Sequence, residues 1–466
     1  MNFDLIVIGS GPGGYVAAIR AAQLGMKVAV VEKESLGGIC LNWGCIPTKA
    51  LLKSAQVFEY ISHAEDYGIV VGSAKADFSA MIARSRGVAD GMSKGINFLL
   101  RKNKITVIEG TGSLVRGKKV KVTDKDGKAS EYEAKNIILA TGGRAKQLPS
   151  LPIDGKHIIE YRKAMSMEKQ PKSMVVVGAG AIGVEFAYFY ASIGTDVTIV
   201  EFMEQGLLPR EDADVSKEMN KIYKKKGIKV LANTAVEKVE TSAKGCKVIA
   251  KNRKTGKVEE IQCDVVLSAA GVTPNTEGIG LETLGVKMTP QGLIEVDQFY
   301  QTNVPGIYAI GDVTPGPALA HTASAEGILC VEKMAGQDIE PLNYDNIPSC
   351  TYCVPEIASV GYTEKAAKEA GYELKVGKFP FSASGKASAS GDKSGFVKVI
   401  FDAKYGEFLG AHLVGQNVTE MIAEVVVARK LETTGHEIIK AVHPHPTMSE
   451  ALMEAAAAAY GEVIHL

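Results

Sequence analysis

A glycine-rich motif occurs twice in this chain, each time in the same order of elements. Residues 9–14 follow an apolar strand and begin a helix, and residues 178–183 do the same. An acid, Glu32 or Glu201, ends the next strand at the same distance from the first glycine of each copy. Strand, glycine turn, helix, strand and acid in this order are typical of a dinucleotide-binding unit. The repeat therefore predicts an α/β protein with two Rossmann-like dinucleotide-binding domains.

The glycines of such a loop have separate roles. The first permits the tight turn, the second lets the main chain approach a pyrophosphate, and the third lets helix and strand pack closely. A single copy would be weak evidence, because glycine-rich turns also serve structural purposes. Glu32 and Glu201 can accept hydrogen bonds from an adenosine ribose, and an acid at the second site disfavours the 2′-phosphate of NADP. The candidate glycines are Gly9, Gly11 and Gly14 in the first loop and Gly178, Gly180 and Gly183 in the second.

Two cysteines, Cys40 and Cys45, lie a short distance after the first loop. Their spacing is little more than one helical turn, so the thiols can close a ring with slight backbone distortion. The chain has seven cysteines, an odd number scattered over 466 residues, which fits a reducing compartment. A disulfide is then expected to be catalytic. The sequence predicts an oxidoreductase with a redox disulfide beside a bound cofactor.

Cys350 and Cys353 form a second pair, with two residues between them. Zinc needs two further ligands, and no other cysteine pair or histidine pair lies near these positions in the sequence, so we predict no metal site. Two small apolar side chains at the start of a strand are the preferred interpretation. A secondary redox pair is the alternative.

Charge and hydropathy exclude other classes of protein. The chain has 53 basic and 53 acidic residues, and no basic run with interleaved aromatic residues occurs, so we expect no nucleic-acid partner. It begins directly with a strand pattern, without a targeting segment, and contains no long apolar stretch. We expect a cytoplasmic protein without membrane contact. A long helical stretch is expected after the cysteine segment, up to about Phe98.

Four motifs together resemble the flavoprotein disulfide reductases: residues 37–49 around the cysteines, 140–142, 309–312, and 443–450. They occur in the order typical of that family and span nearly the whole chain. Within the family, the chain is most similar to enzymes that oxidise protein-bound dihydrolipoamide to lipoamide and reduce NAD. The resemblance implies FAD and NAD as cofactors and a C-terminal α+β dimerisation domain after the two Rossmann-like domains.

The resemblance also implies roles for individual residues. Cys45 would face the flavin and Cys40 would exchange with the substrate, while His445, oriented by Glu450, would be the base supplied by the second subunit of a homodimer. FAD would contact the first loop, Glu32, Lys49, Gly112, Ala140, Thr141, Gly142, Asp312, Ala318, Leu319, Ala320 and His321. NAD would contact the second loop, Glu185, Glu201, Val236 and Gly271, and Glu185 would pair with Lys49.

Residue chemistry supports the base independently. A dithiol must lose a proton to attack a disulfide, an imidazole can take that proton near neutral pH, and a carboxylate holds the imidazole tautomer. Pro444 and Pro446 restrict the backbone around His445. His443 is expected to be a structural histidine, and Trp43, the only tryptophan, to pack between the cysteines and the core.

We expect an FAD-binding domain from residues 1–143 and 272–340, an NAD-binding domain from 144–271, and a dimerisation domain from 341–466. The implied partners are the lipoyl domains of a 2-oxo acid dehydrogenase complex or the glycine cleavage complex. A glutathione-type reductase would carry basic residues at 201–203, and a mercuric reductase would end in a cysteine pair; neither signature occurs. A scaffold component with a structural flavin is the alternative from another class.

Overall fold

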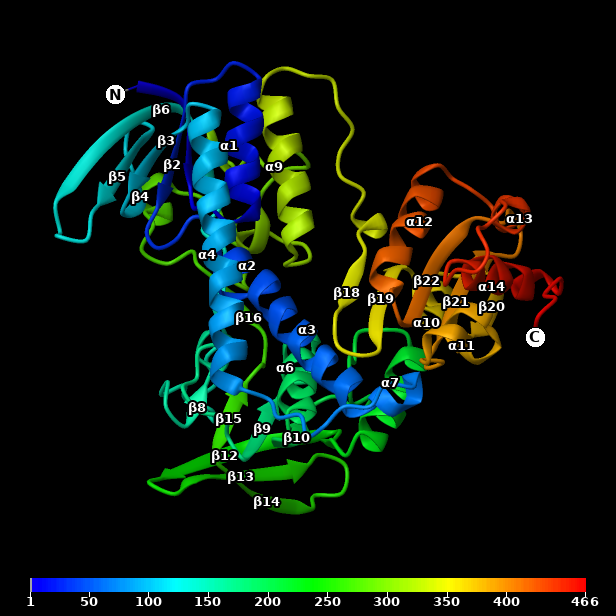
Figure 1. Ribbon diagram of the computed structural model, residues 1–466. Coiled ribbons are helices and arrows are strands. Elements are labelled where there is room, and N and C mark those ends of the chain that lie inside the picture. Colours follow the sequence, from blue (N-terminus) through cyan, green and yellow to red (C-terminus); the bar gives the residue numbers. More distant parts are fainter. Residues whose placement is uncertain (1) are drawn as a thin grey trace. The chain divides into compact units, whose positions relative to one another are not determined.

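The computed structural model describes residues 2–466 (Figure 1). The chain divides into two compact units, and each contains segments that are distant in the sequence. Unit 1 holds the chain up to Ala50, Ile82–Lys146 and Val272–Tyr344. Unit 2 holds Leu51–Met81, Gln147–Gly271 and Asp345–Leu466.

Unit 1 is built on a seven-stranded sheet in the order β3-β2-β1-β6-β5-β4, with β17 also paired to β6. Its strands are β1 (Asn2–Ile8), β2 (Val28–Glu32), β3 (Thr106–Glu109), β4 (Thr111–Val115), β5 (Lys119–Thr123), β6 (Ala129–Leu139) and β17 (Ile307–Ala309). β1 runs parallel to β2 and β6, and β17 runs parallel to β6. Leu5, Ile6 and Val7 are fully buried, because a parallel strand is covered on both faces.

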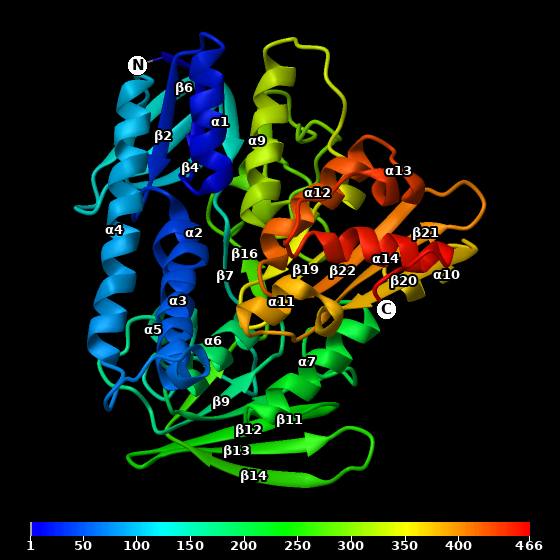
Figure 2. The same ribbon diagram turned by 45° about the vertical axis from the view of Figure 1, so that its right-hand side comes forward.

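Helices α1 (Pro12–Gln23) and α9 (Ala320–Met334) lie side by side in unit 1 (Figure 2). Their close approach depends on small residues: a Cβ on Gly327 would lie 2.8 Å from the Gly13 carbonyl oxygen. The other elements that begin in this unit are α2 (Gly38–Trp43), α3 (Cys45–Ser62), β7 (Gly143–Ala145), β16 (Val272–Pro274) and α8 (Leu281–Leu284). The expected long helical stretch is two helices, α3 and α4 (Phe78–Lys102), separated by a 3₁₀ turn at Ala64–Tyr67 and a non-helical segment.

Unit 2 repeats the strand, loop, helix and strand order of unit 1. Its parallel sheet has the order β11-β10-β9-β15-β8. The elements are β8 (Ile158–Ile159), α5 (Tyr161–Ala164), β9 (Ser173–Val177), α6 (Ala181–Ser192), β10 (Asp196–Val200), α7 (Ala213–Lys225), β11 (Lys229–Leu231) and β15 (Val265–Ser268). A separate antiparallel sheet comprises β12 (Thr234–Ser242), β13 (Gly245–Asn252) and β14 (Val258–Cys263).

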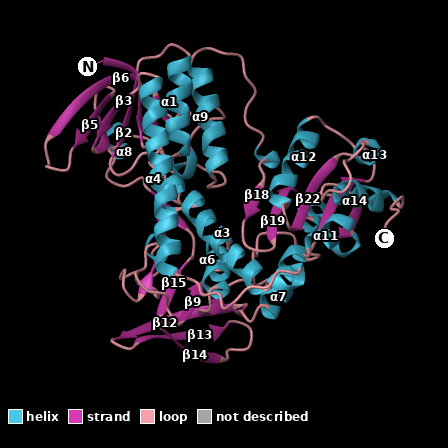
Figure 3. Ribbon diagram, viewed as in Figure 1, coloured by secondary structure: helices cyan, strands magenta, loops and turns pink. Residues whose placement is uncertain are grey.

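The C-terminal part of unit 2 is an antiparallel sheet with helices, in the order β18-β19-β22-β21-β20 (Figure 3). Its strands are β18 (Ser349–Thr351), β19 (Glu356–Gly361), β20 (Leu374–Pro380), β21 (Phe396–Asp402) and β22 (Phe408–Gly415). Its helices are α10 (Glu364–Glu369), α11 (Gly385–Ser390), α12 (Val418–Lys430), α13 (Gly435–Lys440) and α14 (Glu450–Tyr460).

The predicted α/β class with a C-terminal α+β part is confirmed. The domain boundaries stay predictions. Within residues 2–466, every helix is too short or too polar to cross a bilayer.

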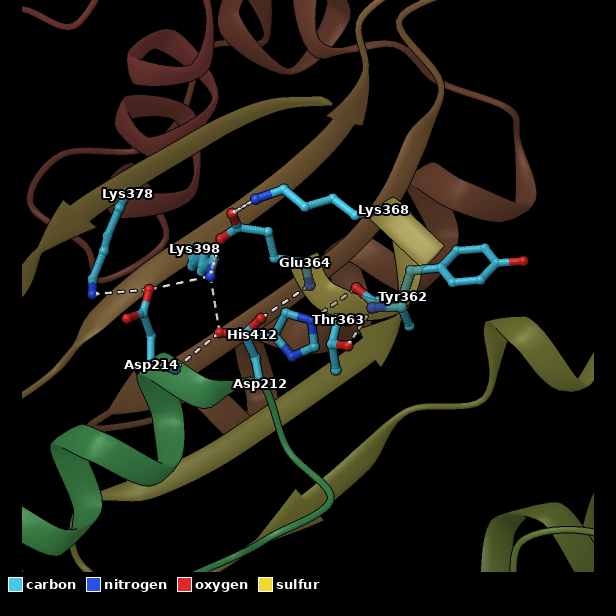
Figure 4. A network of polar contacts seen from close by, with 10 residues as sticks. Asp212, Asp214, Tyr362, Thr363, Glu364, Lys368, Lys378, Lys398 and His412 are labelled. Atoms are coloured by element: carbon cyan, nitrogen blue, oxygen red, sulfur yellow. Dashed lines mark hydrogen bonds and ion pairs between the residues drawn. The ribbon is translucent and has the colours of Figure 1, made fainter. Parts of the chain in front are cut away.

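A buried lysine joins the C-terminal sheet to the N-terminus of α7 within unit 2. The Lys398 side chain on β21 is 4% exposed, and its Nζ lies 2.9 Å from Asp212 Oδ1, 3.1 Å from Asp214 Oδ2 and 2.8 Å from Glu364 Oε2 (Figure 4). Asp212 also caps α7, because its Oδ1 accepts the Asp214 N–H, and its Oδ2 accepts the Glu364 N–H. All three ammonium protons therefore have carboxylate partners.

This network lowers the pKa values of its acids. Burial alone would raise the pKa of Asp212 and of Asp214, but hydrogen bonds from Lys398 outweigh it and hold both pKa values below the usual range. Lys368 and Lys398 lower the pKa of Glu364 in the same way. The stability that these carboxylates contribute is therefore present above the pKa values of the unfolded chain and is lost as pH falls through the folded values.

Replacing Lys398 by Met leaves the buried Asp212 carboxylate without its cation. We expect the free energy of unfolding to fall by about 3–5 kcal/mol at neutral pH. The matched control is Lys378→Met, because Lys378 is 44% exposed and lies 3.4 Å from Asp214, and its loss should cost less than about 1 kcal/mol. Urea unfolding followed by circular dichroism checks this. The difference in the free energy of unfolding between the two variants should narrow as pH falls below about 4, the pKa of these acids in the unfolded chain, toward their lower pKa values in the folded protein. Equal loss in both variants would contradict the prediction.

Candidate active site

The first glycine loop, between β1 and α1, leaves no room for side chains at two of its three motif glycines. Gly9 has φ +101°, and a Cβ there would collide with the Ala140 carbonyl oxygen. A Cβ on Gly14 would collide with the Gly9 carbonyl oxygen, whereas a Cβ on Gly11 would meet nothing within 4 Å. Gly11 is the N-cap residue of α1, and its open position leaves space for an anionic group at the helix N-terminus.

The second loop, between β9 and α6, repeats this geometry. Gly178 has φ +104°, and a Cβ there would collide with the Ala269 carbonyl oxygen. A Cβ on Gly183 would collide with the Gly178 carbonyl oxygen. Gly180 is the N-cap residue of α6 and again has open space around it. Both loops therefore fit the pyrophosphate of a dinucleotide at the same position.

The acid at the end of the second strand holds each loop. Glu32 Oε2 accepts the Ser10 N–H at 2.9 Å, and Glu201 Oε2 accepts the Ala179 N–H at 2.7 Å. The other carboxylate oxygens accept backbone N–H groups two residues after each acid, at Glu34 and Met203. The two acids thus brace their own loops. A carboxylate has about four acceptor positions, so Glu201 keeps positions for a ribose contact, whereas Glu32 also accepts the Ser10 hydroxyl and the Lys33 N–H and has all of its positions engaged.

Cys40 and Cys45 form a disulfide, with their Cα atoms 4.7 Å apart. Cys40 lies in α2 and Cys45 is the first residue of α3. Two glycines tie this redox segment to the first loop: the Gly37 N–H donates to the Ser10 carbonyl at 3.0 Å, and a Cβ on Gly38 would lie 2.6 Å from the Gly11 Cα. The disulfide is therefore anchored directly on the candidate dinucleotide loop.

The remaining FAD candidates in unit 1 lie mostly at the same edge of its sheet. Ala140, Thr141 and Gly142 follow β6, and Asp312 follows β17. Burial raises the pKa of Asp312, and its Oδ2 lies near Gly143, where a Cβ would be 3.3 Å away. Loops after the carboxyl ends of parallel strands are where ligands bind in such sheets.

Three further groups of FAD candidates occupy neighbouring elements. Gly112 on β4 packs against Ile8 and Val31, since a Cβ there would lie 3.0 Å from Ile8. Lys49 lies in the first turns of α3, four residues after Cys45. Ala318, Leu319, Ala320 and His321 surround the N-terminus of α9. Their contacts with FAD stay predictions.

The NAD candidates lie in unit 2 around the second loop. Glu185 is buried in α6, and its Oε1 accepts the Tyr352 N–H at 2.9 Å. Gly271 follows β15 with φ +106°, and Val236 is half-buried on β12, beside an irregularity in its pairing with β13. Glu201 is 6% exposed. The predicted pairing of Glu185 with Lys49 stays a prediction.

His445 and Glu450 form a pair, as the motif predicts. His445 Nδ1 lies 2.8 Å from Glu450 Oε1, and Glu450 Oε2 accepts the Thr447 N–H at 2.8 Å. Burial alone would raise the pKa of Glu450, but the Thr447 N–H and His445 lower it. The His445 side chain is 78% exposed, so its ring can meet a reactant.

His443 differs from His445 in burial and in its contacts. Its Nε2 lies 2.8 Å from Glu424 Oε1, its Nδ1 lies 2.9 Å from the Ala441 carbonyl, and the side chain is 6% exposed. The hydrogen bond with Glu424 raises the pKa of His443. Both ring nitrogens are engaged, so the expectation of a structural histidine is confirmed.

The second cysteine pair is mainly buried. Cys353 is 0% exposed, burial raises its pKa to about 12, and its Sγ lies 3.3 Å from the Pro355 carbonyl. Cys350, on β18, packs against the core of the C-terminal sheet. These contacts favour the apolar interpretation. Within residues 2–466, no three His, Cys, Asp or Glu side chains are grouped to hold a metal ion.

Sequence reasoning missed a set of α4 side chains that hold the redox segment. Arg84 Nη1, Ser85 Oγ and Ser93 Oγ donate to the carbonyls of Ala50, Pro47 and Leu36, at 2.7, 2.8 and 2.9 Å. Arg86 donates to the Asn42 carbonyl and stacks on Trp43. The Trp43 ring is thus covered by a cation from α4. These residues follow the cysteines by about forty positions, and no local signal marks them.

The chain belongs to the pyridine nucleotide-disulphide oxidoreductase family, which it matches over residues 3–327, with the dimerisation domain of that family at 347–456. It is 50% identical to a dihydrolipoyl dehydrogenase of Zymomonas mobilis and 49% identical to one of Rhizobium etli, each covering 100% of this chain and 99% of the relative. The fold matches the crystal structure of LpdA from Mycobacterium tuberculosis with a TM-score of 0.90 and 28% identity, covering 97% of this chain and 98% of that one.

Family membership confirms several predictions. The protein is an oxidoreductase, the family uses FAD and NAD as cofactors, and the dimerisation domain supports a homodimer. The two glycine loops fit these dinucleotides, because each leaves open space only at its second glycine. The roles of the individual site residues stay predictions.

Two substitutions in the second loop separate contact with the ligand from packing within the protein. Gly180→Ala places a methyl group where no protein atom lies within 4 Å and where the bound dinucleotide is expected, so we expect NADH affinity to fall about tenfold with little change in thermal stability. In Gly183→Ala the methyl group meets the Gly178 carbonyl, so the protein itself should lose about 1–3 kcal/mol. NADH titration by fluorescence and thermal unfolding separate the two. Unchanged NADH affinity in Gly180→Ala would contradict the assignment of this loop.

Proposed function

We propose that this protein is a dihydrolipoyl dehydrogenase: it oxidises a protein-bound dihydrolipoyl group to lipoyl and passes the two electrons through Cys40–Cys45 and FAD to NAD. The observation that carries the proposal is the disulfide tied to the first dinucleotide loop through Gly37 and Gly38. The full-length relatives with this name support the choice of substrate.

Both cofactors have residues that would hold them. FAD would bind on the first loop, with its pyrophosphate at Gly11 and the N-terminus of α1, and with Asp312 and residues 140–142 nearby. NAD would bind on the second loop at Gly180. The bound flavin supplies the conversion between thiol and hydride chemistry, which side chains cannot perform.

The chain's own residues carry the thiol chemistry. The proposed order begins when His445 takes a proton from one substrate thiol and Glu450 stabilises the resulting imidazolium. The substrate thiolate then attacks the Cys40 sulfur, which forms a mixed disulfide and releases Cys45 as a thiolate. The second substrate thiol attacks the mixed disulfide and closes the cyclic lipoyl disulfide, and its proton passes to Cys40, which leaves as a thiol. Cys45 holds the resulting electron pair as a thiolate beside the first loop.

The dimer is part of this proposal. His445 is exposed and lies within the part of the chain that matches the family's dimerisation domain, and we propose that it serves the disulfide of the second copy of the chain. Lipoyl domains of 2-oxo acid dehydrogenase or glycine cleavage complexes are the proposed partners. A cytoplasmic location stays a prediction.

Substitutions at the two histidines and the cysteines test the roles directly. Cys40→Ser and Cys45→Ser should abolish dihydrolipoamide-dependent NADH formation, and His445→Gln should lower kcat about 10²- to 10⁴-fold, the usual contribution of a general base. His443→Gln is the matched control, because it should retain kcat within about threefold and lose only stability. Steady-state absorbance of NADH at 340 nm measures each variant.

The same assay tests the substrates of the competing enzyme classes. Glutathione disulfide and NADPH should give no comparable turnover, since the acid at Glu201 disfavours a 2′-phosphate. A protein that is reduced by NADPH as fast as by NADH, or a Cys45→Ser variant that oxidises dihydrolipoamide at the wild-type rate, would overturn the proposal. Flavin that neither NADH nor dihydrolipoamide reduces would indicate the scaffold alternative.

A further inference from the structure

Arg86 occupies a specific position against the redox segment. Its guanidinium carbon lies 4.3 Å from the centroid of the Trp43 ring, and Trp43 lies between Cys40 and Cys45 in the chain. Its Nη2 donates to the carbonyl of Asn42. Arg86 therefore contacts the last two residues of α2, which directly precede Gly44 and the second cysteine.

The charge of Arg86 is only partly compensated. Nη1 is buried, and no residue within 2–466 accepts a hydrogen bond from it. Burial lowers the pKa of the guanidinium, and the carboxylate of Asp90 opposes that shift. A half-buried cation with an unused buried donor interacts more strongly with a negative charge that forms nearby than a fully hydrated cation does.

The other charged groups around this segment are few. Glu34 accepts the Trp43 indole N–H at 3.1 Å, and Lys49 lies on α3, one turn after Cys45. Asn42 is buried, and its side-chain amide donates to the carbonyls of Leu36 and Gly38 at 3.0 Å. These contacts hold the backbone of α2, so the Arg86 stack acts on a rigid segment.

We propose that Arg86 is a positioning residue that holds Trp43 and the Asn42 carbonyl, and that its charge stabilises the thiolate formed when the Cys40–Cys45 disulfide is reduced. A dithiol donates two electrons, the bond between the two sulfurs breaks, and the dithiol becomes a disulfide. One cysteine keeps a proton, and the other is the thiolate, whose proton goes to solvent. The inference rests on the proposed role of this disulfide as the redox couple.

The test measures the redox couple apart from turnover. Wild-type holoenzyme, Arg86→Met and Arg86→Lys are equilibrated in buffers of reduced and oxidised dithiothreitol, and the thiols at positions 40 and 45 are counted by alkylation and mass spectrometry. Removing the charge should lower the ratio of dithiol to disulfide about three- to tenfold. This is the effect expected from the loss of one partly screened interaction between two charges. Arg86→Lys, which keeps the charge and loses the planar stack, should lie between the other two.

Arg101→Met is the matched control, because it removes the same charge from an exposed position near the end of the same helix. Emission from Trp43, the only tryptophan, should change in Arg86→Met and stay unchanged in Arg101→Met. In the reduced enzyme, alkylation should require higher pH in Arg86→Met than in wild type.

Two outcomes are decisive. Equal dithiol ratios in wild type and Arg86→Met, or the same decrease in Arg101→Met, would overturn the inference about Arg86 and leave the proposed function intact. A wild-type disulfide that dithiothreitol cannot reduce under native conditions would overturn the proposed function as well.

Discussion

The contact between the first glycine loop and the chain around it is the constraint on which the active region of unit 1 depends. Gly9 and Gly14 lie so close to backbone carbonyls that no side chain fits, so the position of the loop at the end of β1 is fixed by sterics. The redox segment then lies against the same loop through Gly38 and Gly11. Backbone contacts thereby place the disulfide beside the loop, and the side chains of α4 add hydrogen bonds to the carbonyls around it.

The two copies of the motif show what is shared and what is specific. In both, the acid after the second strand accepts the N–H of the residue that follows the first glycine. After Glu32 the chain enters the redox segment, whereas after Glu201 it leads to Asp212 and the buried Lys398 network. One loop therefore supports thiol chemistry, and its counterpart leads into a structural ion network. The same local unit serves two purposes because the following segment differs.

Local features could be predicted from the sequence, and distant contacts could not. The glycine spacing reflects backbone geometry within a few residues. The two loops, the strand before each loop and the helix after it were therefore predictable. His445 and Glu450 are five residues apart, and their motif predicted the pair that the structure contains. The α4 contacts of Arg84, Ser85 and Arg86 join residues more than thirty positions apart and leave no periodic signal. The break between α3 and α4 carries a local signal, because Gly68, Gly72 and the β-branched residues between them disfavour a helix, and the expectation of one long helical stretch overlooked it.

The paired histidines show why chemistry cannot be assigned from residue type alone. His443 and His445 both contact a carboxylate at 2.8 Å and lie two residues apart, so hydrogen bonding to an acid does not distinguish them. Exposure does: the side chain of His443 is 6% exposed with both nitrogens engaged, and that of His445 is 78% exposed. A base must present one ring nitrogen to its reactant while the other is oriented by the carboxylate. Of these two histidines, His445 satisfies both conditions. The Thr447 N–H donates to the second oxygen of Glu450, which keeps that carboxylate in place without occupying the His445 ring.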